Sequence, residues 1–317
     1  MLENLLFSLN ATIPLFLLMA VGYFIRRIRV VDAAFIKTAN NFNFKVTLPV
    51  LLFVDMAGTD FKETWNLRYF LFCFIVTSVV FFGLWGISRL VIKDKDTVGE
   101  FVQACYRCSL AVNGMALVQS VYGSTEQAGV MILAAVPLYN IFAVILLQTT
   151  SPRNSKTLEA GQMKKAFAGI AKNPIIIAII LGFLSSLIGI KWPAIVSTAL
   201  SYVGRIGTPF ALICIGADFD FRKAFNTLGK SLVASIVKLV ILPLIFVPAA
   251  IWMGFEGGRL ISILIMLAGP TTPVSYIMAK QYGHDGTITS SAVGLTTLFS
   301  SLTLTVFIFL IKTLGYL

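Results

Sequence analysis

The chain has 317 residues, of which 57% are hydrophobic and only 12% are charged, and its mean hydropathy is +0.88. A soluble domain carries about 25% charged residues, so this composition excludes a soluble globular protein and indicates a polytopic membrane protein. The net charge of +11 is better explained by basic cytoplasmic loops than by nucleic acid, because the sequence contains no nucleic-acid-binding module.

The four cysteines, Cys73, Cys105, Cys108 and Cys214, all fall in apolar segments and do not form the disulfide framework of a secreted protein. Cys105 and Cys108 form a C-x-x-C pattern, for which packing is favoured over redox or metal chemistry because nothing nearby pairs with it. The only histidine, His284, is expected in a solvated turn, where it could give mild pH sensitivity. The sequence therefore predicts no metal site and no cofactor.

Ten apolar runs are long enough to cross a bilayer, which takes about 20 residues for a helix. They cover residues 5–25, 33–57, 68–92, 100–121, 127–149, 172–190, 194–217, 230–253, 259–280 and 287–312. The predicted fold is an all-α polytopic membrane protein with ten transmembrane helices, here called spans one to ten. A polar interruption at 150–172 divides them five and five, so the predicted units are residues 1–150 and 172–317, with 151–171 as the linker.

The two halves resemble each other, without gaps, at a constant offset of 160 residues. The matching pairs are Pro14 and Pro174, Gly22 and Gly182, Pro49 and Pro209, Asp60-Phe61 and Asp220-Phe221, Asn66 and Asn226, and Tyr122-Gly123 and Tyr282-Gly283. Prolines, glycines and turn residues that agree in one register indicate an internal repeat. Because five spans is an odd number, the second copy must enter the membrane from the opposite side. Such inverted repeats are typical of secondary transporters with a site at the membrane midplane.

The basic residues between the predicted spans are unevenly distributed. Sixteen Lys and Arg residues fall on one side of the predicted membrane and five on the other. Because basic residues concentrate in cytoplasmic loops, both termini are predicted outside the cell membrane and the 150–172 linker inside.

Four further basic residues lie inside predicted spans: Lys45, Arg107, Arg205 and Lys238. Charge inside a membrane is costly and indicates function by default. Lys45 and Arg205 are mates at the 160-residue offset, and each lies on a polar stripe of its helix. We expect the stripes to face the bundle interior or a watery vestibule and to attract an anion. The alternative is a structural pair at a dimer or lipid interface.

Span four carries a patch of polar and small residues, Ser109, Asn113 and Gly114, at mid-depth. The helix could unwind here, or Asn113 could bond to a neighbouring helix. In span five, Asn140 could line the same cavity, although an ordinary interhelical hydrogen bond is favoured for it.

Span nine contains the sequence Gly269-Pro-Thr-Thr-Pro-Val-Ser275. Pro270 and Pro273 each remove an N–H donor and clash with the preceding turn, so the helix is predicted to break here. Residues 260–269, at 1.5 Å rise each, reach about 15 Å, which places the break near the middle of a roughly 30 Å hydrocarbon core. A second half-helix would begin at 271–275 with unpaired N–H groups and a positive dipole end.

If spans four and nine both break, two half-helix N-termini converge and favour an anion, while the half-helix C-termini offer carbonyls to a cation. The basic residues inside the spans favour an organic anion such as a carboxylate. Asp55 and Asp218, near span ends, could bind a coupling proton or cation, or could cap helices. The candidate substrate-binding residues are Lys45, Arg107, Ser109, Asn113, Gly114, Asn140, Arg205, Pro270, Thr271, Thr272, Pro273 and Ser275.

Short motifs along the whole chain resemble those of the auxin efflux carrier family, which includes plant PIN-type auxin exporters and bacterial malate or malonate permeases. The motifs are Asn173-Pro174 with Gly182, Leu48-Pro49-Val-Leu-Leu-Phe53, Thr208-Pro209 with Ile215-Gly216, Arg107-Cys-Ser with Tyr122-Gly123, and Pro270 with Ala279-Lys-Gln-Tyr282. The resemblance implies two inverted halves whose broken helices four and nine cross at the centre. It also implies a homodimer, and an elevator-type motion of spans 3–5 and 8–10 against a scaffold of spans 1, 2, 6 and 7.

The leading hypothesis is therefore a secondary transporter of small organic anions, such as malate, malonate or auxin-like acids, in the plasma membrane, with possible proton or sodium coupling. The alternative is a receptor or scaffold that uses the same fold without transport. An intramembrane enzyme lacks support, because the sequence has one histidine, no metal cluster, no G-x-S-x-G motif and no phosphate loop.

Overall fold

The computed structural model describes residues 2–58, 65–110, 114–122, 126–152 and 172–317. Throughout this part of the chain the regular structure is helical, as the composition predicted. Five helical segments, or runs of adjoining helical segments, are long and apolar enough to cross a membrane, and they cover residues 67–91, 127–149, 194–218, 221–252 and 287–313. Two shorter apolar helices cover 174–188 and 257–268. Most of the predicted linker lies outside the described residues.

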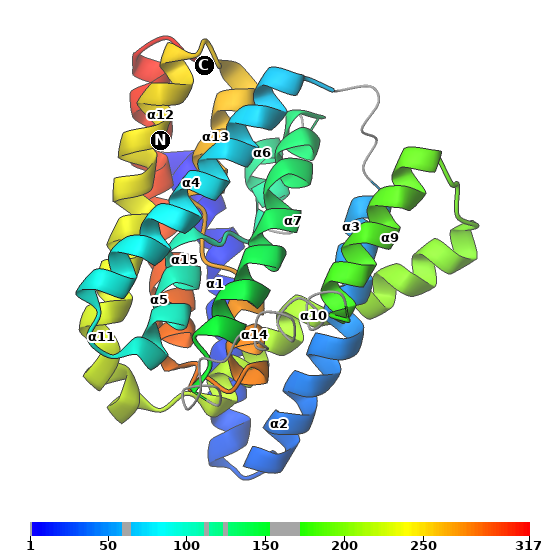
Figure 1. The fold of residues 1–317 in the computed structure, drawn as a ribbon, viewed down its shortest axis with the longest axis vertical. Helices are drawn as coiled ribbons and strands as arrows, with labels where there is room; N and C mark the ends of the chain where they lie inside the picture. Colours follow the sequence, from blue (N-terminus) through cyan, green and yellow to red (C-terminus); the bar gives the residue numbers. More distant parts are fainter. Residues whose placement is uncertain (1, 59–64, 111–113, 123–125, 153–171) are drawn as a thin grey trace, which may run out of the picture.

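The first half consists of α1 (Leu2–Arg27), α2 (Ala33–Phe42), η1 (Asn43–Thr47), α3 (Leu48–Ala57), α4 (Leu67–Val91), η2 (Lys95–Thr97), α5 (Val98–Tyr106), α6 (Met115–Tyr122) and α7 (Glu126–Thr149). The second half consists of α9 (Pro174–Ile188), α10 (Ala194–Asp218), α11 (Phe221–Ile236), η5 (Val237–Ile241), α12 (Leu242–Trp252), α13 (Gly257–Ala268), α14 (Val274–Gln281) and α15 (Thr287–Thr313). Figure 1 shows both termini near the same end of the helical bundle.

Several helices begin at an Asp or Asn residue whose side chain accepts a backbone N–H of the first turn. Asp32 accepts from Phe35 at 2.7 Å, and Asn173 accepts from Ile175 at 2.8 Å. Asp220 likewise receives the N–H of Arg222 at 2.9 Å. Such caps satisfy donors that the helix itself leaves open, so these polar residues fix where the helices start.

Two turns of π-helix, η1 and η5, each precede a proline. Pro49 and Pro243 have no N–H, so the usual bond to the residue four positions earlier cannot form. The neighbouring amides reach five residues back instead: Leu48 donates to Asn43, and Leu242 donates to Val237. Each wide turn carries one lysine, and π-turns of this kind occur frequently at functional sites.

The helices α1, α3, α9 and α10 pack closely, and Figure 1 shows α3 and α9 side by side. A Cβ atom at Gly22 of α1 would lie 2.1 Å from the carbonyl oxygen of Ile213 in α10. A Cβ atom at Gly182 of α9 would lie 2.6 Å from the carbonyl oxygen of Phe53 in α3. Only glycine allows these backbones to approach so closely.

The remaining helices form a second group around α13 and α7. Every residue from Leu260 to Ala268 of α13 is buried. Aromatic rings fill the space beside α7, where Phe81 of α4 stacks on Phe142 with ring centroids 4.3 Å apart. This densely packed core surrounds the two places where helices are interrupted.

Candidate functional site

The predicted break in the ninth apolar run is confirmed. The helix α13 ends at Ala268 and α14 begins at Val274, and Gly269–Pro273 between them is not helical. All five of these residues are buried. The break therefore lies inside the protein, where its freed backbone groups need protein partners.

The fourth apolar run is interrupted as well, although it contains no proline. The helix α5 ends at Tyr106, and Arg107 has an extended backbone with φ −76° and ψ 137°. Among the described residues, the next α-helix is α6, which begins at Met115. Ser109 and Gly114 of the predicted polar patch are buried beside this interruption, whereas Asn113 lies outside the described residues.

The two interruptions contact each other directly and satisfy each other's backbone groups. The N–H of Ser109 donates to the carbonyl of Pro270 at 3.1 Å. The hydroxyl of Thr271 donates at 2.8 Å to the carbonyl of Ala104, in the last turn of α5. The N–H of Thr271 in turn donates to the hydroxyl of Thr296 in α15 at 2.9 Å. The breaks thus form one hydrogen-bonded unit.

Arg107 lies in this unit with only 2% of its surface exposed. Its Nη2 donates to Oδ1 of Asn140 in α7 at 3.0 Å, and its Nη1 lies 2.9 Å from Sδ of Met278 in α14. Its Nε has no hydrogen-bond partner, and none of the ion pairs found in the described part of the chain involves it. A buried guanidinium without a carboxylate is an unbalanced charge.

Two more polar groups beside Arg107 have spare hydrogen-bonding capacity. Gln103, one turn earlier on α5, donates through Nε2 to the carbonyl of Ser275 at 3.0 Å. Its Oε1 and the hydroxyl of Ser275 are buried without partners. We call Gln103, Arg107, Asn140, Ser275 and Met278 the Arg107 cluster. Gln103 and Met278 are not among the residues predicted from the sequence, although Gln103 is a polar residue at helical spacing from Arg107.

The other predicted residues of the break, Pro270, Thr272 and Pro273, are buried in the connecting segment. The hydroxyl of Thr272 accepts the N–H of Val274 at 3.4 Å. These residues form the wall of the break next to the Arg107 cluster.

Lys45 and Arg205 lie elsewhere, and of the two positions expected for them, the bundle interior or a watery vestibule, the interior is wrong. Both side chains are exposed in the single chain. The interior faces of these helices are occupied by their mutual contact, in which Asn43 donates to the carbonyl of Gly207 at 3.0 Å. The repeat predicted that the two positions are equivalent but could not predict which way they point. The predicted positions that remain for these two side chains are an aqueous vestibule and an interface with a second chain.

Asp218, the last residue of α10, contacts two residues of α14. Its Oδ2 accepts the hydroxyl of Tyr276 at 2.7 Å and lies 2.7 Å from Nζ of Lys280. Asp55 is in α3, which packs against α9 and α10. Asp218 therefore contacts α14, the helix that carries Ser275 and Met278, through two residues outside the Arg107 cluster.

His284 is not in a solvated turn, which corrects the expectation from sequence. It is 4% exposed, with Nδ1 at 3.0 Å from the carbonyl oxygen of Asp96 and Nε2 at 3.1 Å from that of Leu147. Beside it, Glu100 of α5 accepts the N–H of Gly286 at 2.8 Å and that of Thr289 at 3.2 Å. The turn between α14 and α15 is thus anchored to α5 and α7.

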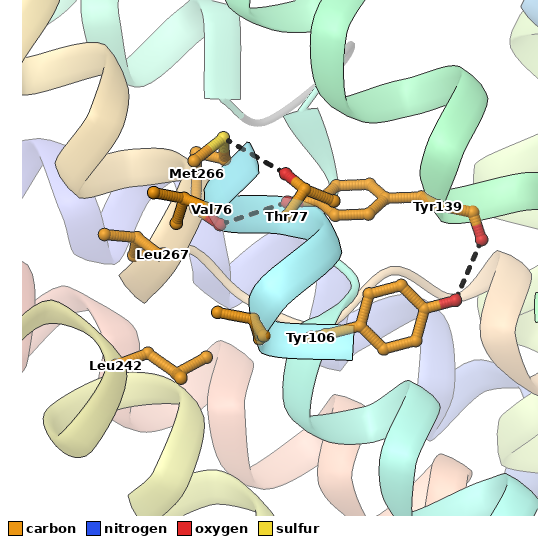
Figure 2. A pocket seen from close by; sticks show the side chains of 8 residues that line it. Val76, Thr77, Tyr106, Tyr139, Leu242, Met266 and Leu267 are labelled. Carbon is orange, nitrogen blue, oxygen red and sulfur yellow. Dashed lines mark hydrogen bonds between the residues drawn. The ribbon is translucent and has the colours of Figure 1, made fainter. Parts of the chain in front are cut away.

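A small cavity of about 10 Å³ lies behind the break, between α4, α5, α7, α12 and α13. Figure 2 shows Tyr106 and Tyr139 beside it, with the hydroxyl of Tyr106 donating to the carbonyl of Tyr139 at 3.0 Å. Its walls are mainly apolar and its volume suits at most about one water molecule. It is lined by Val76, Thr77, Val80, Tyr106, Tyr139, Leu242, Met266 and Leu267. It is too small for an organic anion.

The sequence was compared with known protein families and proteins. A family model described as "Membrane transport protein" matches residues 7–308. A "Putative malonate transporter" of Rhizobium meliloti is 23% identical over 309 residues, which cover 95% of this chain and 94% of that protein. The "Uncharacterized transporter YfdV" of Escherichia coli K12 is 21% identical over 246 residues, 76% of this chain and 77% of that protein.

Plant proteins match over a shorter stretch. The rice "Auxin efflux carrier component 3a" is 28% identical over 130 residues, which cover 39% of this chain and 21% of the carrier. The chain therefore spans about a fifth of the length of this plant relative, whereas it spans nearly all of the Rhizobium protein.

Proposed function

Because the chain belongs to the membrane transport protein family, which includes auxin efflux carriers, it is a membrane transporter and not an enzyme, and we propose that it is a secondary transporter of small organic anions. The proposed substrate is a carboxylate such as malonate, malate or an auxin-like acid, bound between the two helix interruptions. The name of the Rhizobium relative supports malonate as the first carboxylate to test.

The Arg107 cluster is the observation that carries this proposal. A guanidinium remains charged in proteins and presents a planar fork that matches a carboxylate. Arg107 is buried, has no acid among its described partners, and retains a free Nε. The open hydroxyl of Ser275 adds a possible hydrogen bond to the same ligand. A carboxylate would balance the charge and satisfy both donors.

The surrounding break residues would complete the site. We propose Ser109, Asn113, Gly114, Pro270, Thr271, Thr272 and Pro273 as its walls, and Asn140 as the group that orients Arg107. Lys45 and Arg205 are proposed to attract the anion from an exposed face or, alternatively, to lie at the interface of a homodimer. Asp55 and Asp218 are proposed as groups that bind a coupling proton or cation.

We propose ten transmembrane helices in two inverted five-helix repeats. The helix bounds support this: subtracting 160 from the α13 range 257–268 gives 97–108, against 98–106 for α5. The α10 range 194–218 becomes 34–58, against 33–57 for the run from α2 to α3. The two glycine contacts, Gly22 with Ile213 and Gly182 with Phe53, are related by the same offset, because adding 160 to positions 22 and 53 gives 182 and 213. Both termini would then lie outside the plasma membrane.

The proposed mechanism is an elevator movement. The scaffold would consist of α1, α2, α3, α9 and α10, and the moving body would consist of α4–α7 and α11–α15. Both interruptions and the whole Arg107 cluster belong to the second body. Polar contacts that would have to change include the bonds from Tyr276 and Lys280 to Asp218. A site that closes around its ligand also explains why the cluster is buried.

Uptake of labelled malonate into proteoliposomes, followed by a series of other carboxylates, tests the proposal. We expect Arg107→Gln to raise the half-saturating concentration at least about tenfold, because losing one partner of a buried charge pair costs about 2–5 kcal/mol. Arg107→Lys should give an intermediate loss, since it keeps the charge but not the fork. Arg222→Gln, at an exposed arginine of α11, is the matched control.

Three outcomes would contradict parts of this proposal. If Arg107→Gln leaves the half-saturating concentration unchanged, the anion does not bind at the Arg107 cluster. Carboxylates that raise the melting temperature of the protein without being transported would favour the receptor alternative. Neither transport nor binding of any carboxylate by folded protein would refute an organic-anion transporter.

A further inference from the structure

Lys238 is a second buried cation next to the breaks. It lies in the π-turn η5 and is 0% exposed. Its Nζ donates to the carbonyl of Leu267 at 3.4 Å, which is the one hydrogen bond of this ammonium found among the described residues. None of the described ion pairs includes it. An uncompensated lysine in a membrane protein is costly and requires an explanation.

The acceptor of this bond belongs to the end of a broken helix. The last four carbonyls of an α-helix have no helical partner, and the C-terminal end carries a partial negative charge. At the end of α13, the carbonyl of Ile265 receives the N–H of Gly269 at 2.8 Å, and that of Met266 receives the hydroxyl of Tyr139 at 3.4 Å. The carbonyl of Leu267 accepts the hydrogen bond from Nζ of Lys238. The ammonium therefore occupies the negative end of the half-helix.

In transporters with discontinuous helices, such C-terminal carbonyls bind the coupling cation. We propose that the Lys238 ammonium is a resident cation that fills this position, so that the transporter binds its anion without a metal ion at the break. The inference rests on the proposed function and deepens it, because of the two coupling ions proposed for Asp55 and Asp218, a proton or a cation, it selects the proton. The fixed charge stabilises the α13 end that sodium would otherwise stabilise.

The π-turn and the repeat both support a specific placement of this charge. The wide turn before Pro243 directs Lys238 into the core, on a buried helix face that also carries Ser231 and Ser235. Its mate at the 160-residue offset is Ser78, whose hydroxyl bonds to Phe74 of its own helix at 2.8 Å. Of these two equivalent positions, the one in the second half therefore carries a cation and the one in the first half carries a hydroxyl.

A stability experiment tests the resident cation independently of transport. Lys238→Ala should lower the melting temperature of the full chain in nanodiscs, and propylammonium should restore several degrees by occupying the vacated space. Propylammonium should not stabilise the wild type or Lys191→Ala, a control at an exposed lysine. Lys238→Arg should melt near the wild type, and Lys238→Met, which keeps the length but not the charge, should melt lower.

Transport provides the second measurement. Malonate uptake by the wild type should be equal in sodium, potassium and choline buffers, while Lys238→Met should lose most of its uptake and Lys238→Arg should keep it. Sodium-dependent uptake, or a wild-type melting temperature raised by sodium but not by choline, would overturn the inference. So would a Lys238→Met protein that melts like the wild type. If no carboxylate is transported at all, the organic-anion proposal fails. The melting experiments still show whether the Lys238 ammonium stabilises the end of α13.

Discussion

At the scale of single residues, buried polar side chains in this chain satisfy backbone groups that helix ends leave open. Glu100 accepts two amides at the start of α15, and Thr271 donates to a carbonyl at the end of α5. Arg107 is different, because part of its donor capacity is unused. The anion site proposed above rests on this unused capacity.

Asp285 gives a prediction about pH. Burial raises the pKa of its carboxyl, but hydrogen bonds from Thr287 and Lys223 and the charges of Lys223 and Lys280 outweigh this, so the pKa lies below its usual value. A lowered pKa in the folded state adds stability above the unfolded pKa of about 3.9, and this stability is lost as the pH falls through the folded value. The pair with Lys223, at 2.9 Å, is about half exposed, which limits the gain through solvent screening.

We therefore expect Asp285→Asn to reduce the free energy of unfolding by at most about 1 kcal/mol at pH 7 and by a smaller amount at pH 3. Thermal unfolding at the two pH values measures this. A double-mutant cycle with Lys223→Gln isolates the pair from other effects of the substitution. An equal loss at both pH values would show that the ion pair does not contribute.

Side-chain chemistry at this scale was only partly predictable. Arg107 and Asn140 were each recognised as candidates, since charge and amide groups stand out in apolar spans. Their contact with each other, and the participation of Met278, depend on how α5, α7 and α14 pack. His284 shows the opposite case, because a short polar turn suggests solvent although tertiary contacts bury it.

At the scale of elements, the two interruptions have different causes. Pro270 and Pro273 mark the break between α13 and α14 in the sequence itself. The break after α5 has no such signal and depends on bonds from the other segment, such as that from Thr271 to Ala104. The break between α13 and α14 could be predicted from residue types. The break after α5 could only be suggested by the 160-residue offset, because it depends on tertiary partners.

Thr271→Val tests this dependence. The substitution keeps the shape of the side chain but removes the hydroxyl that satisfies the carbonyl of Ala104. We expect the free energy of unfolding to fall by about 1–3 kcal/mol, as for a buried acceptor left without its partner. Hydrogen exchange should increase in α5 as well as in α14. Thr303→Val, which removes a partly exposed hydroxyl whose described bonds lie within α15, is the control, and an equal effect there would contradict the interpretation.

At the scale of the whole molecule, the chain is organised by contacts between its halves. The helix α1 packs against α10, and α3 packs against α9, through glycines at equivalent positions of the repeat. The apolar runs and the 160-residue offset were sufficient to predict these helices. They could not predict which pairs touch, because the same offset is compatible with several arrangements of the helices.

Gly22→Ala and Gly182→Ala test this packing together. Each added Cβ would meet a carbonyl oxygen, so each should lower the free energy of unfolding by about 1–3 kcal/mol, and the two losses should be similar. Gly83→Ala in α4, where nothing lies within 4 Å of the added atom, should instead be neutral or stabilising by up to about 1 kcal/mol. Thermal unfolding measures all three, and a harmless Gly22→Ala would contradict the close approach.

The pairing of α1 with α10 and of α3 with α9 also affects how the protein is made. A chain emerges from the ribosome starting at its N-terminus, and domains usually fold as their residues appear. Here α1 has its main partners, α10 and α15, in the second half, and the same half supplies α9 and α10 to α3. The newly made α1 and α3 therefore lack these partners until residues beyond 174 are inserted into the membrane. The second half of the chain, which is synthesised last, therefore completes the folding of this transporter.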